Sequence, residues 1–274
     1  MARNDKNVVA PYGRFVVSDD LPRRTHPWPL ESPNESAQET VFGPRMKPIP
    51  SFRAAHLMPY VDFLLQVGAP VERGLRRAKL PTQLREHPDA YLPQIPTLSF
   101  LKEMSRSEGI EDFGFQVLQD LRIRDFSAPF ATAVYGLPTL KAALEKFCEL
   151  VHLEDNYLRF WITLGGTKAK LHIANSFALE PQERQYEDWS EIMALIAIVR
   201  MFAGKAWVPE EIGFRSNSPP GRLASEQFPA THLVIGQNAA WITVPLEMLS
   251  RPPRKLPVPM DAGQTPDLKP ATSA

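Results

Sequence analysis

Residues 157–174 read YLRFWITLGGTKAKLHIA, two runs of alternating apolar and polar residues on either side of a glycine pair. Successive side chains of a strand point to opposite faces, so the apolar residues of each run share one face. These residues are Leu158, Phe160, Ile162 and Leu164 in the first run and Ala169, Leu171 and Ile173 in the second. Gly165-Gly166 suits a two-residue hairpin turn, which requires positive φ. The stretch predicts an antiparallel hairpin of strands 157–164 and 168–174.

Helical periodicity flanks the hairpin on both sides. Upstream, after Pro138, one helix face carries Leu140, Leu144, Phe147, Cys148 and Val151. Downstream, the longest helix is predicted over residues 181–203, with Gly204 ending it. Its stripe consists of Tyr186, Trp189, Ile192, Met193, Ile196 and Val199. The second half of this helix is apolar on almost every side, so we expect it to be buried or to form a dimer contact.

Four shorter helices are predicted nearer the N-terminus. The first carries Leu57, Val61, Leu64 and Leu65 on one face and stops at Gly68. Pro70 suits the first position of the second helix. Thr97 is the expected N-cap of the third helix, and Asp112 is the expected N-cap of the fourth.

Short strands are predicted downstream of the long helix, around residues 212–214, 232–235 and 240–244, and Pro245 then opens a short helix. Helices therefore dominate the first part of the chain and strands the second. The predicted fold class is α+β, with a helical N-terminal layer followed by an antiparallel sheet with interleaved helices.

Proline-rich segments lie at both ends of this region. Residues 1–50 and 251–274 contain many prolines and no sustained apolar period. Such segments bury too little surface to offset their chain entropy. We therefore expect two disordered tails and one folded domain, residues 51–250.

The composition is that of an ordinary globular domain, with 43% apolar and 23% charged residues. Basic and acidic residues number 31 each, which disfavours direct nucleic-acid binding because that usually requires a basic surplus. A single cysteine excludes an internal disulfide. The N-terminus lacks the apolar segment of a secretory signal, and the longest aliphatic run, residues 192–199, is too short for a bilayer. We expect a cytoplasmic protein that binds no membrane.

Cys148 is the one candidate thiol nucleophile. His152 lies at i+4 and would be its base, as in a small cysteine-dependent enzyme. Cys148 also belongs to an apolar stripe beside Phe147, which favours a buried core residue. We assign no catalytic residue.

Histidines and carboxylates offer a weak metal signal. His152, Glu154 and His172 lie near the hairpin, but no pair of histidines has the spacing of a known metal motif. We expect satisfied or exposed imidazoles, and we assign no metal-ligating or cofactor-binding residue.

Adjacent carboxylates occur twice, as Glu154-Asp155 and Glu187-Asp188. Consecutive side chains on a helix or strand point in different directions. Neither pair is therefore expected to act as an acid–base couple.

Four basic residues crowd the second predicted helix: Arg73, Arg76, Arg77 and Lys79. Three of them share a face, which would suit a phosphate or DNA contact. A solvated helix face is the preferred interpretation, with Glu72 and Glu86 nearby to offset the charge.

Aromatic residues are the class most typical of small-molecule pockets, although they also fill ordinary cores. Those on or beside the hairpin and the long helix are Tyr157, Phe160, Trp161, Tyr186 and Trp189. The sequence does not separate the two roles, so the ligand-binding residues are unknown at this point.

Five motifs, in order, resemble the N-terminal effector and dimerisation domain of AraC-type transcription regulators, the "arabinose-binding" type. They are Leu64-Leu65-x-x-Gly68, Phe113-Gly114-Phe115, YGLPTLKAAL at 135–144, Trp207-Val208-Pro209 with Ile212-x-Phe214, and residues 228–252. The similarity covers residues 52–253. One departure is Leu137, where the family favours a serine N-cap.

The resemblance implies a non-enzymatic domain that binds a small-molecule effector and dimerises, with itself or with a related regulator, to modulate transcription. Such regulators carry a C-terminal pair of helix-turn-helix units, and the residues after Leu249 are too few and too proline-rich to form them. One alternative is therefore a truncated remnant of a DNA-binding regulator. The small cysteine-dependent enzyme is the other.

Overall fold

The computed structural model describes residues 7–10, 13–17, 48–175 and 177–254. The α-helices are α1 Met58–Gln66, α2 Val71–Arg77, α3 Gln94–Ser107, α4 Phe113–Leu118, α5 Ile123–Phe126, α6 Ala128–Tyr135, α7 Leu140–Glu154, α8 Pro181–Ala203 and α9 Arg222–Gln227. Three short 3-10 helices are η1 Ala54–Leu57, η2 Leu84–Glu86 and η3 Leu246–Ser250. The strands are β1 Asn7–Ala10, β2 Gly13–Val17, β3 Ser51–Arg53, β4 Tyr91–Pro93, β5 Arg159–Gly165, β6 Lys168–Ala174, β7 Glu211–Gly213, β8 His232–Ile235 and β9 Ala240–Pro245. The α+β class is confirmed.

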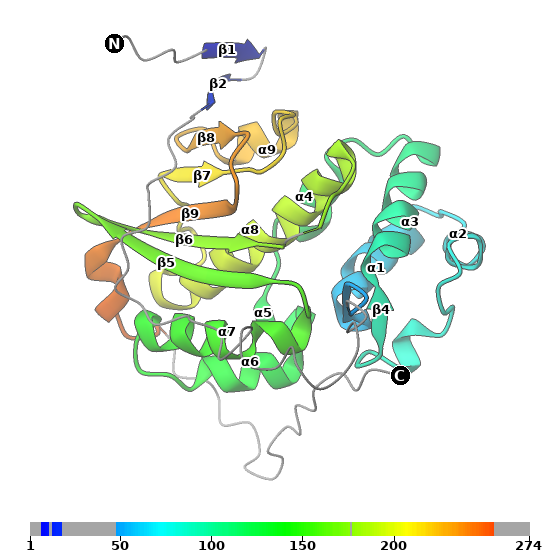
Figure 1. Cartoon of the computed structure of the whole chain (residues 1–274), viewed down its shortest axis with the longest axis horizontal. Coiled ribbons are helices and arrows are strands. Elements are labelled where there is room, and N and C mark those ends of the chain that lie inside the picture. Colours follow the sequence, from blue (N-terminus) through cyan, green and yellow to red (C-terminus); the bar gives the residue numbers. More distant parts are fainter. Residues whose placement is uncertain (1–6, 11–12, 18–47, 176, 255–274) are drawn as a thin grey trace, which may run out of the picture.

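The main sheet has seven strands in the order β1-β2-β8-β7-β9-β6-β5, and β3 and β4 form a separate pair. It is mixed rather than purely antiparallel, because β8 runs parallel to both β7 and β2. The connection from β7 to β8 contains α9, and such a crossover permits a parallel pairing that a tight hairpin does not. Figure 1 shows helices α1 to α3 grouped to one side of the sheet and α6 and α7 beside β5.

The predicted hairpin is confirmed as β5 and β6, which pair from Arg159 opposite Ala174 to Gly165 opposite Lys168. Its two-residue turn is Gly166-Thr167, one residue later than predicted, and Gly166 has a positive φ of 57°. Strand β6 lies inside the sheet, and its three predicted inward residues are completely buried. Strand β5 lies at the edge, where Phe160 is buried but Leu164 is 61% exposed. The apolar face of the hairpin is therefore fully buried on β6 and partly exposed to solvent on β5.

Helix α8 occupies the predicted residues and forms the centre of the domain. A capping box between Glu180 and Glu183 starts it, and Gly204 ends it with a positive φ of 99°. Every residue from Glu191 to Val199 except Ala194 is buried within this one chain. The helix therefore has no open apolar stripe there, and the expected dimer contact on it finds no support.

Two of the expected helix starts are placed differently in the structure. Helix α3 begins at Gln94, so Thr97 is inside its first turn, where its hydroxyl donates to the Pro93 carbonyl. Thr139, not residue 137, is the N-cap of α7, and its Oγ1 accepts from the amide of Ala142 at 3.2 Å. Leu137 therefore removes no capping group.

Asp112 precedes α4 but does not cap it. It has a left-handed φ of 48°, and its carboxylate accepts from the Leu223 amide at 2.9 Å, at the start of α9. A Cβ at Gly221 would lie 1.5 Å from Asp112 Oδ1, so only glycine fits there. Asp112 therefore joins two segments that are distant in sequence.

The two ends of the chain are described only in part. Strands β1 and β2 lie within the segment where the sequence predicts no regular structure. Residues 18–47 and 255–274 lie outside the described residues. At the other end, the Arg251 carbonyl accepts from the Leu140 amide, and the Arg254 amide donates to the Met201 carbonyl. The chain thus contacts the domain up to residue 254.

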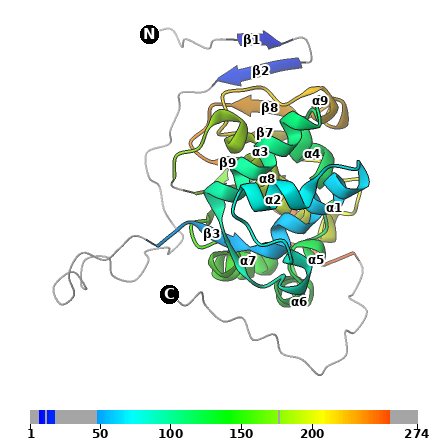
Figure 2. The same cartoon turned by 90° about the vertical axis from the view of Figure 1, so that its right-hand side faces the viewer.

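Viewed from the side, helices α1 to α3 stand in front of α8 and the sheet (Figure 2). The contact between these layers is where the candidate site lies. None of the helices in the described part of the chain has the length and hydropathy that crossing a bilayer requires.

Candidate functional site

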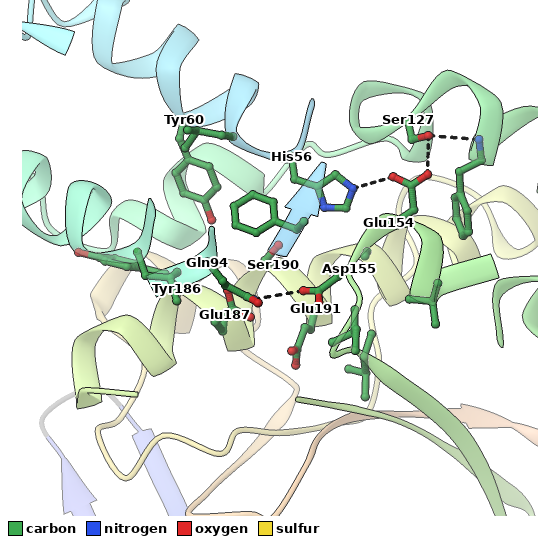
Figure 3. A pocket seen from close by; sticks show the side chains of 18 of the residues that line it. His56, Tyr60, Gln94, Ser127, Glu154, Asp155, Tyr186, Glu187, Ser190 and Glu191 are labelled. Atoms are coloured by element: carbon green, nitrogen blue, oxygen red, sulfur yellow. Dashed lines mark hydrogen bonds and ion pairs between the residues drawn. The ribbon is translucent and has the colours of Figure 1, made fainter. Parts of the chain in front are cut away.

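A cavity of about 80 Å³ lies where η1, α1 and α3 meet α6, α7 and α8. One water molecule needs about 15 Å³ of such space, so the cavity has room for about five. Much of its wall is apolar and includes Leu98, Leu101, Ile123, Phe130, Phe147 and Val151. The polar side chains labelled in Figure 3 converge on the remaining wall. An apolar cavity with a few placed polar groups is typical of a small-molecule site.

Glu154, at the end of α7, forms one polar end of this wall. Its carboxylate contacts His56 Nε2 at 2.9 Å and Arg53 at 3.8 Å. It also accepts from Ser127 Oγ at 2.8 Å, and Ser127 in turn is the N-cap of α6. Although Glu154 is only 3% exposed, basic groups and a hydroxyl surround it.

Asp155 and Glu187 form the other polar end, together with Gln94. The Gln94 amide donates from Nε2 to the Asp155 carboxylate at 3.1 Å, and the Tyr157 amide donates to Asp155 at 2.9 Å. Glu187 accepts from Asn175 Nδ2 at 2.9 Å. Both carboxylates are buried, and both are held by neutral donors.

Arg215 supplies the buried positive charge next to this end. Its guanidinium contacts Asp188 at 2.7 Å and Glu191 at 2.6 Å, and all three side chains are at most 6% exposed. Arg184 lies nearby, but its guanidinium donates to Asn175 and to the Phe177 carbonyl. The cations are thus directed to only part of the acidic cluster.

Burial raises the pKa of every carboxyl in this cluster. Burial and the neighbouring Asp155 carboxylate raise the pKa of Glu187 to about 7. Burial raises the pKa of Asp155 and Asp188 above the ordinary range, and that of Glu191 well above it. The charged forms are disfavoured because a buried carboxylate loses its hydration. Glu187 therefore exchanges a proton near neutral pH.

Gln94 carries an unsatisfied acceptor at the cavity. It is 1% exposed, and its Oε1 has no hydrogen-bond partner among the described residues. Turning the amide round would place this oxygen against the Asp155 carboxylate, so the orientation shown is the favourable one. A buried acceptor without a partner costs stability until a donor reaches it.

Two tyrosines complete the wall opposite Glu154, as Figure 3 shows. Burial, with the charge of Glu187, raises the pKa of Tyr60 well above its ordinary value. The Tyr186 hydroxyl shares a hydrogen with Ser105 Oγ at 2.5 Å and accepts from Gln182 at 2.8 Å. Both phenols stay neutral at physiological pH, and they offer aromatic surface to an occupant.

The candidate nucleophile Cys148 lies apart from this cavity. Its thiol is partly buried and donates to the Phe160 carbonyl at 3.4 Å, and burial and Glu149 raise its pKa. His152 is exposed. Within the described residues, the thiol's hydrogen bond goes to a backbone carbonyl rather than to a base, and Cys148 packs beside the core.

The three possible metal ligands are not brought together. Glu154 contacts His56, His152 is exposed, and His172 stacks on Trp161 at 5.1 Å. Burial and Lys170 lower the pKa of His172 to about 4, so it is neutral at physiological pH. Within the described residues, no group of three or more histidines, cysteines or carboxylates could hold a metal ion.

The basic residues of α2 lie on a solvated face. Arg76 pairs with Glu72 in the same helix, and Arg77 pairs with Glu103 of α3. Glu103, not Glu86, is thus the second acidic partner. The face is partly neutralised, as the solvated interpretation expects.

Of the aromatic candidates, only Tyr186 lines the cavity. Trp189 is a core residue that packs on Phe115 and Phe214. Phe160 packs on Phe147, and Trp161 on His172. Tyr157 contacts Phe177 and donates to the Pro48 carbonyl.

The adjacent carboxylates separate as predicted, but the tertiary structure pairs them differently. Glu154 and Asp155 have different partners, and so do Glu187 and Asp188. Asp155 instead comes close enough to Glu187 to raise its pKa. Sequence reasoning missed Gln94, although it occupies the apolar stripe of α3 with Leu98 and Leu101, an unusual position for an amide.

A second hollow opens between α4, the start of α8 and the loop before α9. Asp112, Gln182, Gln185 and Arg222 are among the residues that line it. A smaller share of its wall is apolar than in the first cavity, and Gln94 does not line it. The first cavity is therefore the better candidate site.

Comparison with known proteins identifies the family of the domain. No curated protein matches the chain. A crystal structure of the transcriptional regulator CdpR from Pseudomonas aeruginosa is similar with a TM-score of 0.44 and 16% identity; the match covers 66% of this chain and 55% of that one. The chain thus spans little more than half the length of CdpR. Residues 68–253 match the family described as the N-terminal arabinose-binding domain of AraC transcription regulators. This match covers more than half of the chain, so the protein belongs to the AraC arabinose-binding domain family, as its motifs predicted.

Proposed function

We propose that this domain is a non-enzymatic sensor that binds a small-molecule effector in the cavity between α3 and α8 and thereby modulates transcription. The observation that carries the proposal is the cavity itself, with its apolar wall and the unsatisfied Gln94 acceptor. Buried polar groups in native proteins are nearly always partnered, and an unpartnered one calls for an explanation. An effector that donates a hydrogen bond supplies it.

The position of the cavity suits a sensor. It is bounded by the N-terminal helices on one side and by α8, the central helix, on the other. An occupant would contact both layers and stabilise their packing. A ligand shifts a conformational equilibrium only by its difference in affinity for the two states, and contacts across a layer boundary supply such a difference.

A thermal-shift screen tests effector binding. The intact protein is screened against amino acids, sugars, fatty acids, aromatic acids and amines. A ligand specific to the folded state adds about 2.7 kcal/mol of stability at 100 times its Kd, which shifts Tm visibly. We expect a saturable shift from one chemical class. If no compound of the panel shifted the Tm of the folded protein, the proposal would be contradicted.

A filled-cavity variant ties any hit to this site. Ala194 lines the cavity from α8, and Ala194→Leu places three more carbon atoms into it. We expect this variant to fold and to lose the shift. Ala206→Leu, at an exposed position after α8, is the matched control and should respond like the original protein. Equal responses from both variants would place the binding elsewhere.

Dimerisation, which the family resemblance also implies, stays a prediction. The burial of α8 removes the helix first expected to carry it, and the edge strand β5 with exposed Leu164 is a more accessible surface. Sedimentation velocity at micromolar concentration tests it. A monomer at all concentrations would exclude self-association as part of the function.

A further inference from the structure

We infer that the effector is a small organic cation, a primary ammonium on a short apolar stem, held between Asp155, Glu187 and the Gln94 side-chain carbonyl. The inference rests on the proposed function and names the chemical class of its ligand. Three separate features of the cavity carry it: the local balance of charge, the unsatisfied acceptor and the shape of the apolar wall.

At this end of the cavity the buried carboxyl groups outnumber the cations that pair with them. Four buried carboxyl groups belong to the cluster: Asp155, Glu187, Asp188 and Glu191. Arg215 pairs with the last two, whereas Arg184 donates to an amide and a backbone carbonyl. Within the described residues, neither Asp155 nor Glu187 makes an ion pair. A cationic occupant would favour the ionised forms of Asp155 and Glu187, and an anionic one would disfavour them.

The Gln94 carbonyl gives independent support, because it is not charged. Its Oε1 is buried and unpartnered, and only a hydrogen-bond donor satisfies it. An ammonium group carries three N–H donors and no acceptor. The two carboxylates and this carbonyl are three acceptors, so the numbers agree. A carboxylate or ether ligand would leave Oε1 unsatisfied.

The apolar wall sets the rest of the ligand. Leu98, Leu101 and Phe130 line the cavity away from the carboxylates, and they suit a hydrocarbon stem. The cavity volume of about 80 Å³ suits a short stem rather than a long chain. The rings of Tyr60 and Tyr186 also face this space, and aromatic faces attract cations.

Proton exchange at Glu187 makes the binding depend on pH. In the empty cavity this carboxyl is half protonated near pH 7. The titratable and charged groups that face Glu187 are Tyr60, Asp155, Arg184, Asp188, Glu191 and Arg215. His56 acts indirectly, because its charge lowers the pKa of Asp155. An ammonium favours the ionised form of Glu187, so binding releases a proton. Affinity for the cation should therefore increase from pH 6 to pH 8.

Isothermal titration calorimetry with three matched probes tests the inference on the intact chain. n-Butylammonium, 1-butanol and butyrate share one stem and differ in charge. We expect n-butylammonium to bind and the other two to bind at least about tenfold more weakly. Titration in two buffers with different ionisation enthalpies should show proton release for n-butylammonium.

Variants then assign the contacts. Glu187→Gln should fold, because the neutral side chain matches the protonated form, and it should weaken n-butylammonium binding at least about tenfold and remove the pH dependence. Glu149→Gln changes an exposed carboxylate on α7 and is the matched control, with no expected change. Unchanged binding to Glu187→Gln would overturn the inference.

The outcomes separate this inference from the proposed function. Binding of butyrate, butanol or a neutral sugar in place of the ammonium, with loss of binding in Ala194→Leu, would overturn the cation and keep the sensor. Silence of every probe and of the wider panel would overturn both. Binding of n-butylammonium that Ala194→Leu does not affect would place the amine outside this cavity and overturn the inference.

Discussion

Glu154 and Asp155 are neighbours in sequence, yet they stand at two electrostatically different ends of one cavity. Glu154 is compensated by Arg53, His56 and the Ser127 hydroxyl. Among the described residues, the hydrogen bonds to Asp155 come from neutral donors, the charge of His56 acts on it without a direct contact, and Glu187 lies close by. The comparison teaches that burial alone does not define a binding group. At one end the buried carboxylate contacts basic side chains directly, and at the other the nearest cation, Arg215, pairs with Asp188 and Glu191 instead.

The largest expected effect concerns Arg215, the one buried cation paired with the acidic end. Arg215→Met would leave Asp188 and Glu191 buried without a counter-charge. Breaking a buried pair from one side typically costs about 3–5 kcal/mol. Urea unfolding at pH 7.5 measures this loss. Arg76→Met removes one partner of an exposed pair and should cost less than about 0.5 kcal/mol; equal losses would show that Arg215 is not a structural counter-charge.

Glu187→Gln should stabilise the empty protein at alkaline pH. The pKa of Glu187 is about 7 in the folded state and near its ordinary value of 4.5 when unfolded. A raised folded pKa means that the native state holds the proton more tightly, so stability falls as pH rises from 4.5 to 7. The Gln variant escapes this loss, which is at most about 3 kcal/mol. Its advantage in urea unfolding should grow between pH 5 and pH 7 and then level off; a constant difference would contradict the raised pKa.

Glu154→Gln should act in the opposite direction. The change removes the charge that contacts His56 and lies 3.8 Å from buried Arg53, whose nearer partner is Asp89 at 2.5 Å. Hydrogen bonds to charged groups contribute about 1.5–3 kcal/mol, so we expect a loss of about 2 kcal/mol at pH 7.5. The same unfolding series measures it beside Glu187→Gln. If both Glu154→Gln and Glu187→Gln stabilised the protein, the two carboxylates would not differ in how well their charges are compensated.

The smallest expected effect separates the two roles of Ser127. Its hydroxyl caps α6 through the Phe130 amide and also donates to Glu154. Thr139 caps α7 through one amide and is the matched control. Loss of a cap costs about 1 kcal/mol in either Ser127→Ala or Thr139→Ala, and we expect the former to lose about 1 kcal/mol more. Equal losses would mean that the bond to Glu154 contributes nothing.

Local patterns in the sequence predicted most of the secondary structure. The hairpin appears as Arg159–Gly165 and Lys168–Ala174, and the long helix has its predicted bounds. Periodicity succeeds there because it reports on neighbours along one element. For the same reason, periodicity misplaces the N-cap of α3 and, although Asp112 is at the N-cap position of α4, does not reveal the partner of its carboxylate. The start of α3 depends on residues before Thr97, and the partner of Asp112 is Leu223, which is 111 residues away.

The candidate site was not predictable in this way. Gln94 and Asp155 are 61 residues apart, and Glu187 lies on a further helix. Considered as adjacent pairs, the carboxylates were correctly judged to point apart. No rule about neighbours along the chain could show that Asp155 would face Glu187.

The sequence by itself determined the α+β class, the hairpin, the long central helix and the family. Each of these depends on spacing and residue type within short stretches, which sequence retains. The tertiary structure alone decided which carboxylates are compensated, that Gln94 lacks a donor and that a cavity adjoins both. Burial and charge pairing act through space between distant segments, and their energies depend on local hydration, which no linear pattern records.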